Sequence, residues 1–350
     1  MRANSYTLGG TIVASAALFC PVPPSPASQQ PEAIPPALEE AVQMVFSGYR
    51  VTAQYHYVMT GKVRLLLFWI GKDDVGDGYV GLGRGSERPE LEMIRLRVGS
   101  DPAKAPRRIN RWGAGTEVLE RDLASGVPRS SAFFGFMKTA EGTSVRAVER
   151  ELESEQQKQQ YPFEASINRV EPTAVRASIL PMLSRVDLDI GKMDEAEHMV
   201  LDQYADAFSS SRYLELHGDG RGGCDSNVGF LFTLKEITEA ALSGQEAPIA
   251  SCYLYNTRHY TMTLSQVTRI DERGISYGLD GGEEVERSYR DLLDLRFEVR
   301  KRLTGKRSKF SLLLGTSGEL RGVPVQMTYQ PNWWFKAILN LHTATGPRFP

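Results

Sequence analysis

Apolar and polar residues alternate with a period of two in several separate segments of the chain. In the clearest of these segments every second side chain is apolar or aromatic: residues 51–59, 94–98, 295–299 and 323–329. This pattern is typical of antiparallel strands that bury one face and leave the other in water. Glycine-containing turns separate the later segments, at residues 280–282, 304–306 and 315–318. We therefore predict an α+β fold that is mainly antiparallel β, with two β-rich regions and a few helices.

Helical periodicity is confined to three segments. Residues 144–157 and 230–241 carry apolar stripes at helical spacing, and residues 193–208 form a shorter third candidate. Gly244 stands where the C-terminal cap of the second of these helices belongs. Because strands and helices do not alternate regularly, a doubly wound parallel sheet is not expected.

The N-terminal segment has the features of an export signal. Residues 8–22 are apolar and mostly small, and this run is shorter than the about 20 residues of a membrane span. Ser25-Pro26-Ala27 offers small residues at the positions that a signal peptidase reads. We expect residues 1–27 to be a signal peptide and the protein to be periplasmic or secreted; a disordered cytosolic N-terminus is the alternative. Phe19 precedes Cys20 where a lipobox has a small residue, which argues against a lipoprotein.

Two composition changes divide the rest of the chain. Residues 28–36 are rich in proline and indicate a flexible linker. The polar, serine-rich stretch Phe208–Arg212 separates an α+β region, residues 37–212, from an antiparallel β region with one helix, residues 213–350. The formal net charge of −2 gives no basic excess that would indicate nucleic acid as a partner. No long apolar run follows Ala27, so we expect no transmembrane segment after processing.

The stretch Gly76–Gly81, GDGYVG, spells the G-x-G-x-x-G motif of dinucleotide-binding loops. It follows an apolar run at residues 63–70, but the next residues, LGRGSERPE, lack the apolar stripe of the helix that would face a pyrophosphate. We predict instead a strand or hairpin that turns at Lys72-Asp73-Asp74. The carboxylates of this segment do not follow the order of a calcium-binding loop. We therefore predict no metal site and no cofactor.

Two cysteines remain after the predicted cleavage, Cys224 and Cys252. In an oxidising compartment such a pair indicates a disulfide, which would stabilise the fold by about 3–4 kcal/mol on the chain-entropy model. The alternative is a catalytic thiol at Cys224, with His259 or His217 as its base.

Basic side chains gather at two places. Arg107, Arg108 and Arg111 precede Trp112, and guanidinium groups beside an aromatic ring can grip a phosphate or a carboxylate. The second group flanks a predicted hairpin turn and consists of Arg300, Arg302, Lys306 and Arg307. Both are possible anion-binding surfaces. The alternatives are a solvated loop in which Trp112 fills the core and a charged hairpin end that protects a sheet edge.

Tyr329, Trp333 and Trp334 form a third candidate surface, apolar and aromatic. Exposed, it would stack on sugars or contact a membrane; the alternation after Trp333 favours core packing instead. The chain contains neither the G-x-S-x-G elbow of hydrolases nor the H-E-x-x-H helix of zinc proteases. No catalytic residue is therefore assigned.

The C-terminal region, residues 252–342, resembles uncharacterised periplasmic β-proteins in the order of its elements. The strand LYNTRHYTMTL is followed by the charged strand DLRFEVRKRL, by KFSLLL, and by the closing run GELRGVPVQMTYQPNWWFKAILNL. The segments FWIGKDDVGDGYVGLGRG and APRRINRWG are similar to hypothetical exported bacterial proteins. The resemblance spans about half of the chain and implies an envelope location and a β-sheet fold, but neither a reaction nor catalytic residues.

Three functional hypotheses remain. The first is an exported, non-enzymatic protein that binds or assembles an apolar or anionic envelope component, with a lipid, a glycan or another envelope protein as partner. The second is a hydrolase or thiol enzyme that uses Cys224 and a histidine. The third is a purely structural module without a pocket. A concave sheet face that is lined by aromatic residues and open to solvent would favour the first, and a fully packed face would count against it.

Overall fold

The computed structural model describes much of the chain after residue 35. The described residues are 36–45, 47–65, 68–106, 112–138, 161–170, 174–184, 212–217, 228–255, 258–279, 281–302, 304–332 and 335–345. Residues 34–350 form one compact unit. The predicted signal peptide and the helices predicted at residues 144–157 and 193–208 lie outside the described residues.

Strands dominate the described part of the chain. Its two α-helices are α1 (Pro36–Val45) and α4 (Phe230–Leu242). The first eight strands are β1 (Tyr49–Leu65), β2 (Phe68–Gly85), β3 (Leu91–Ser100), β4 (Trp112–Arg121), β5 (Pro128–Lys138), β6 (Tyr161–Val170), β7 (Ala174–Ser184) and β8 (Arg212–His217). The remaining six are β9 (Ile249–Tyr255), β10 (Arg258–Gly278), β11 (Glu284–Lys301), β12 (Arg307–Gly315), β13 (Pro324–Asn332) and β14 (Phe335–Thr345).

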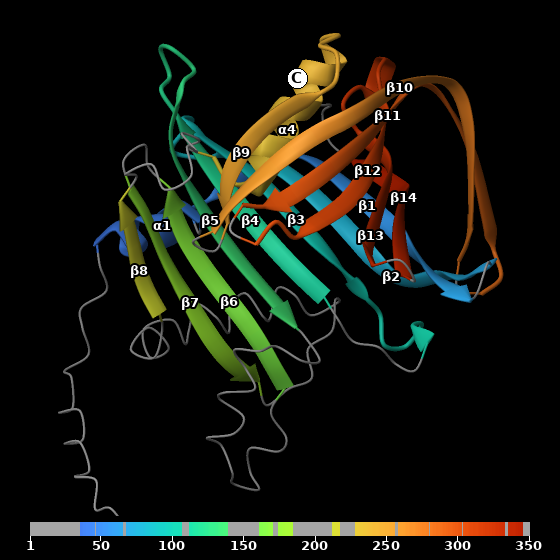
Figure 1. Ribbon diagram of the computed structural model, residues 1–350, viewed down its shortest axis with the longest axis horizontal. Helices are drawn as coiled ribbons and strands as arrows, with labels where there is room; N and C mark the ends of the chain where they lie inside the picture. The colour runs from blue at the N-terminus through green and yellow to red at the C-terminus, as the bar shows by residue number, and fades with distance from the viewer. Residues whose placement is uncertain are drawn as a thin grey trace, which may run out of the picture. The chain divides into compact units, whose positions relative to one another are not determined.

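One antiparallel sheet contains all of these strands (Figure 1). Neighbours along the chain pair as hairpins, except that β8 and β9 form the two edges and β1 pairs with β14. The resulting order is β8-β7-β6-β5-β4-β3-β2-β1-β14-β13-β12-β11-β10-β9. The prediction of a mainly antiparallel β fold is confirmed. Several of these pairs, such as β2–β3 and β13–β14, have short connections, which is why alternation and turn residues identify them. Longer segments, residues 139–160 and 185–211, separate β5 from β6 and β7 from β8.

The long β10–β11 hairpin bends over the ends of β1 and β2 (Figure 1). At its far end, the amide of Gly278 donates to Oδ2 of Asp73, 3.2 Å away. The Tyr277 hydroxyl donates to the carbonyl of Leu341 in β14, also at 3.2 Å. Tyr277 packs in the same buried cluster as Tyr55 and Tyr57 of β1. The sheet is therefore curled, and a tyrosine-rich core lies between β1, β14 and the far half of this hairpin.

Helix α4 packs against β9 and β10 and also contacts β4 (Figure 1). Its predicted apolar stripe packs on the sheet, with Ile237 and Ala241 buried and Phe230 and Leu234 partly buried. Gly244 follows the end of the helix with a φ of +94°, a left-handed conformation that glycine adopts without strain. The N-cap residue, Gly229, has no side chain to cap the helix. Glu117 of β4 supplies the missing acceptor: its two carboxylate oxygens accept from the amides of Gly229 and Leu231, each at 2.7 Å.

Glu117 is completely buried, with 0 % of its surface exposed. Burial raises the pKa of its carboxyl from 4.5 to about 7, against the opposing effect of the backbone amides of Leu231, Gly229 and Phe232. A single titratable side chain thus ties the start of α4 to the middle of the sheet.

Two local expectations differ from the structure. The turn of the first hairpin lies between Leu65 and Phe68 rather than at residues 72–74, so the apolar run 63–70 is split between β1 and β2. The bend expected at residues 72–74 is instead an irregularity within β2, where Asp74 has a φ of 49°. Helix α1 was also not expected, because its ten residues follow directly on the proline-rich linker.

The G-x-G-x-x-G stretch lies in the middle of strand β2, as the missing helix had indicated. Gly76 pairs with Ser100 of β3 and with Met59 of β1. A Cβ atom added at Gly76 would lie 2.0 Å from the carbonyl oxygen of Gly99. Here glycine allows neighbouring backbones to approach closely, and the motif does not form a phosphate loop.

Candidate functional site: a polar cleft beside the first hairpin

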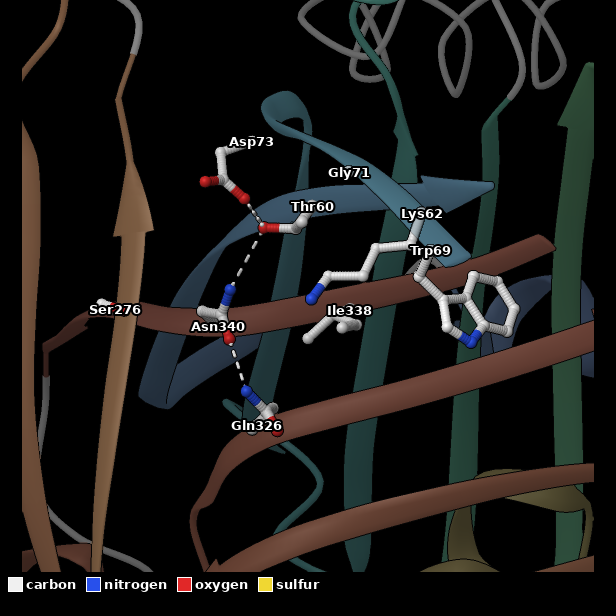
Figure 2. Close-up of a pocket in the computed structure, with 9 residues that line it drawn as sticks. All are labelled: Thr60, Lys62, Trp69, Gly71, Asp73, Ser276, Gln326, Ile338 and Asn340. Atoms are coloured by element: carbon white, nitrogen blue, oxygen red, sulfur yellow. Dashed lines mark hydrogen bonds between the residues drawn. The ribbon is translucent and has the colours of Figure 1, made fainter. Parts of the chain in front are cut away.

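A small polar cleft opens where the far end of the β10–β11 hairpin meets β1, β2, β13 and β14. Its volume is about 250 Å³. Nine residues line it: Thr60, Lys62, Trp69, Gly71, Asp73, Ser276, Gln326, Ile338 and Asn340 (Figure 2). They come from five strands. Four of these, β2, β1, β14 and β13, are neighbours in the sheet, and the bent β10–β11 hairpin brings in Ser276 of β10.

Strand register places these side chains on one face. Thr60 of β1 lies opposite Ile338 of β14, and Lys62 lies opposite Gly71 of β2. On the other side of β14, Asn340 lies opposite Gln326 of β13. Directly opposed residues of antiparallel strands project to the same side of the sheet. The cleft is thus a direct consequence of the closing β1–β14 pair.

The polar side chains of the cleft form one hydrogen-bonded row (Figure 2). Thr60 donates from Oγ1 to Oδ1 of Asp73 at 2.6 Å, and accepts at the same oxygen from Nδ2 of Asn340 at 3.4 Å. Gln326 donates from Nε2 to Oδ1 of Asn340 at 2.8 Å. Together with the Gly278 amide, which holds the other oxygen of Asp73, these bonds fix the orientation of every planar group in the row.

Burial differs along this row. Thr60 and Asn340 are buried and form the floor of the cleft, whereas Asp73 and Ser276 are exposed at its rim. Each amide and carboxylate has more hydrogen-bonding capacity than the row uses. The Oε1 oxygen of the Gln326 amide and the outer lone pairs of Asp73 are therefore suited to a polar ligand that enters from the rim.

Lys62 and Trp69 form the other end of the cleft (Figure 2). Among the described residues, no ion pair joins Lys62 to a carboxylate, so its ammonium group brings a positive charge to a cleft whose one acid, Asp73, is held by Thr60 and Gly278. The ammonium of Lys336 lies 4.9 Å from the centroid of the Trp69 ring. This contact holds the ring in place and adds a second cation at the mouth.

A second acidic group lies next to the cleft, on the following residues of β2. Asp74 is buried and forms an ion pair with Lys104, whose Nζ lies 3.1 Å from both carboxylate oxygens. Burial raises the pKa of the neighbouring Asp77, against the charge of Lys104. Since Lys104 already neutralises Asp74, this group anchors the loop after β3 to β2 and leaves Lys62 as the cation of the cleft.

The structure brings together one of the two predicted basic groups. Arg300 and Arg307 lie opposite each other at the β11–β12 hairpin end, Lys306 is in the turn, and Arg302 follows β11. Arg307 also forms an ion pair with Glu298, its Nη1 lying 3.1 Å from Oε1. In the other group Trp112 is buried, with 4 % of its surface exposed, and Arg107, Arg108 and Arg111 lie outside the described residues. Anion binding at either place stays a prediction.

The aromatic and thiol candidates are described only in part. Tyr329 of β13 is half-exposed, and Trp333 and Trp334 lie outside the described residues. Cys252 is in β9, opposite Thr261 of β10. Its predicted partner Cys224 lies outside the described residues, so both the disulfide and the alternative catalytic thiol stay predictions.

The sheet face that is richest in tyrosine is packed and not open to solvent. Tyr55, Tyr57, Tyr277 and Tyr289 form one cluster with Leu292 and Leu341, and each is less than a tenth exposed. This packing counts against an apolar ligand between β1 and the β10–β11 hairpin. The polar cleft, by contrast, is a hollow in the described part of the chain to which several strands contribute.

The described residues show two further absences. No group of three or more histidine, cysteine or carboxylate side chains among them is arranged to hold a metal ion. None of the helices in this part of the chain is long and apolar enough to cross a membrane.

The cleft was not found by sequence reasoning. Its residues follow no motif, and Thr60 and Asn340 are 280 positions apart. Trp69 belongs to the apolar run 63–70, which was expected to be one strand, and Lys62 directly precedes this run. A signal existed only in the composition of this run, which holds a tryptophan and is flanked by basic residues.

Comparison with known proteins adds little to this description. No protein-family model and no curated protein matches the chain. One solved structure, the crystal structure of a beta-barrel-like protein of a domain of unknown function, DUF1849, from Brucella abortus, is similar over 85% of this chain and 98% of that one. The TM-score is 0.42 and the sequence identity 11%. That protein is a bacterial β-rich protein of unknown function.

Proposed function

We propose that this protein is an exported, non-enzymatic binding protein whose polar cleft takes an anionic saccharide of the cell envelope. The observation that carries the proposal is the hydrogen-bonded row Asp73-Thr60-Asn340-Gln326. Lys62 and Trp69 line the same cleft beside this row (Figure 2). Export is supported by the apolar segment and small residues before Ser28.

The chemistry of the cleft matches a sugar ring with one acidic group. Planar amide and carboxylate side chains with spare donors and acceptors pair with ring hydroxyls. The apolar face of a sugar packs on an aromatic ring such as Trp69. Lys62 would then meet a carboxylate or phosphate on the ligand. The volume of about 250 Å³ is just below that of pockets for drug-sized ligands and is suited to one sugar unit.

The hydrogen bonds also argue for binding rather than catalysis. The side chains of Thr60 and Asn340 are buried and hold one another, so the cleft is formed before the ligand arrives. The one carboxylate in the lining, Asp73, accepts from a hydroxyl and from a backbone amide. Both of its oxygens thus already act as hydrogen-bond acceptors within the protein, and each keeps a lone pair for a donor group of the ligand.

Calorimetric titration with matched sugars tests the proposal. Glucuronic acid, galacturonic acid and N-acetylmuramic acid are the anionic probes, and glucose is the neutral one. We expect at least one anionic sugar to bind more tightly than glucose. Lys62→Gln should remove that preference, and Trp69→Ala should weaken binding of the same sugar by roughly tenfold.

Two variants away from the cleft are the controls. Lys306→Gln removes an exposed cation at the β11–β12 hairpin end, and Tyr329→Ala removes a half-exposed aromatic ring. Both should bind the sugar as the wild type does. Equal binding of charged and neutral sugars, no binding of any, or equal loss in the control variants would refute the proposed function.

A further inference from the structure

The end of the β1–β2 hairpin exposes apolar side chains on the face opposite the cleft. Val63 lies opposite Ile70, and Phe68 lies opposite Leu65, in the next pair of positions on the same face. Their exposed fractions are 40 % for Val63, 57 % for Ile70 and 74 % for Phe68. Large apolar side chains that share one face and stay exposed indicate a surface that is covered in use.

This apolar tip, defined as Val63, Phe68 and Ile70, carries positive charge. Residues 62–72 contain three basic side chains, Lys62, Arg64 and Lys72, and no acidic one. Lys336 adds a fourth cation, on the cleft side of the hairpin next to Trp69. A partner that covers the tip therefore has to accept apolar groups and supply negative charge around them.

The size of the tip distinguishes between possible partners. A stable protein interface buries about 800 Å² on each side and involves some 20–30 residues. The three exposed apolar side chains in the described part of this hairpin end are far fewer than this. They are sufficient for a lipid surface, because a few apolar side chains at the depth of the headgroups together with basic neighbours give reversible binding.

We propose that the apolar tip of the β1–β2 hairpin inserts into the interfacial layer of an anionic lipid bilayer, with Lys62, Arg64, Lys72 and Lys336 at the level of the lipid phosphates. Trp69, on the other face of the same hairpin, lies at the depth where tryptophan is enriched in membrane-bound proteins. The protein thus lies on the membrane surface through a hairpin end. The inserted apolar side chains lie on the face opposite the saccharide cleft, whereas Lys62 and Trp69 belong to both surfaces.

Co-sedimentation with lipid vesicles tests this proposal. The protein is purified from an exporting host and its N-terminus is determined by mass, so that every variant carries the same chain. We expect binding to vesicles of phosphatidylcholine mixed with phosphatidylglycerol and much weaker binding to phosphatidylcholine alone. Raising the salt to about 0.5 M, where the Debye length is about 4 Å, should release most of the protein.

Two sets of variants locate the contact. The double variant Phe68→Ser, Ile70→Ser should bind the anionic vesicles at least about tenfold more weakly. Lys72→Gln should weaken binding by about fivefold, as expected for one basic side chain near the surface. The matched control is Leu123→Ser, Val127→Ser, which removes two exposed apolar side chains between β4 and β5, where the exposed fractions are 72 % and 57 %.

Thermal unfolding of each variant should match that of the wild type, because all four apolar positions are exposed. The proposal is wrong if the tip variant binds vesicles as the wild type does or if the control variant loses as much binding. It is also wrong if the wild type binds neither kind of vesicle. Dimerisation that Phe68→Ser, Ile70→Ser abolishes, without vesicle binding by the wild type, would replace the lipid surface by a second copy of the chain.

Discussion

Replacing Glu117 with glutamine should change how the stability of the protein depends on pH. Two effects compete at this completely buried carboxyl. Desolvation favours the protonated form, and the amides of Gly229, Leu231 and Phe232 at the start of α4 favour the ionised one. Desolvation is the larger effect and raises the pKa of Glu117 from 4.5 to about 7.

The sign of the pH dependence follows from this shift. Between pH 4.5 and pH 7 the native state holds a proton that the unfolded chain has already released. The free energy of unfolding therefore falls as the pH rises through this window, by about 1.4 kcal/mol for each unit of pKa shift. For the shift at Glu117 the full loss is about 3 kcal/mol. Most of it, about 2–3 kcal/mol, falls between about pH 5 and pH 8.

Glutamine keeps the shape of the side chain and cannot titrate. It also has one acceptor fewer, so one buried backbone amide of α4 loses its partner, at a cost of about 1–3 kcal/mol. At pH 5 we expect the wild type to be the more stable protein. By pH 8 the difference should have fallen by about 2–3 kcal/mol, so that the variant equals or exceeds the wild type.

Urea unfolding of both proteins at several pH values between 5 and 8 measures this difference. Titrations of other groups cancel because only the difference between wild type and variant is used. Glu246→Gln, an exposed carboxyl shortly after α4, controls for the loss of one negative charge. A difference that stays constant, or that grows in favour of the wild type as the pH rises, would show that the three amides outweigh desolvation and would refute the reasoning.

Three further outcomes can be checked by denaturant unfolding or thiol titration. Gly76→Ala should unfold the protein or cost more than about 3 kcal/mol, because the new Cβ would meet the backbone of β3, whereas Gly274→Ala, with open space around it, should be tolerated. Tyr277→Phe should cost about 1 kcal/mol for the lost bond to Leu341, and Tyr57→Phe should cost nothing or stabilise, since no described group pairs with its buried hydroxyl. The denatured protein should show no free thiol until it is reduced, and Cys252→Ser should cost about 3–4 kcal/mol; two free thiols would contradict the predicted disulfide.

Most strands were predictable because their signals are local. The alternation at residues 94–98 and 295–299 and the glycine turns at 280–282 and 304–306 each depend on a few neighbouring residues. The closing pair β1–β14 has no local signal, since it joins residues near the two ends of the described chain. The order of the sheet and its curl therefore could not be derived from periodicity.

The cleft was not predictable from the sequence, because it depends on the closing β1–β14 pair and on an unexpected position of the first hairpin turn. Its floor depends on Thr60 and Asn340, which only the closing pair brings together. Its mouth depends on the hairpin turn between Leu65 and Phe68, inside a run of apolar residues. Turn prediction uses glycine, proline and small polar residues, and this turn has none of them.

The two proposed surfaces lie on opposite faces of one hairpin, and this arrangement makes them separable. Alternation along β1 and β2 places Lys62 and Trp69 on the cleft face and Val63 and Ile70 on the other. If both proposals hold, Phe68→Ser, Ile70→Ser should release the protein from vesicles and leave sugar binding unchanged. Trp69→Ala should weaken sugar binding by roughly tenfold and affect vesicle binding less than the tip variant does. Loss of both activities in both variants would mean that the hairpin forms a single site, and that the ligand is one molecule with a sugar and an acyl part.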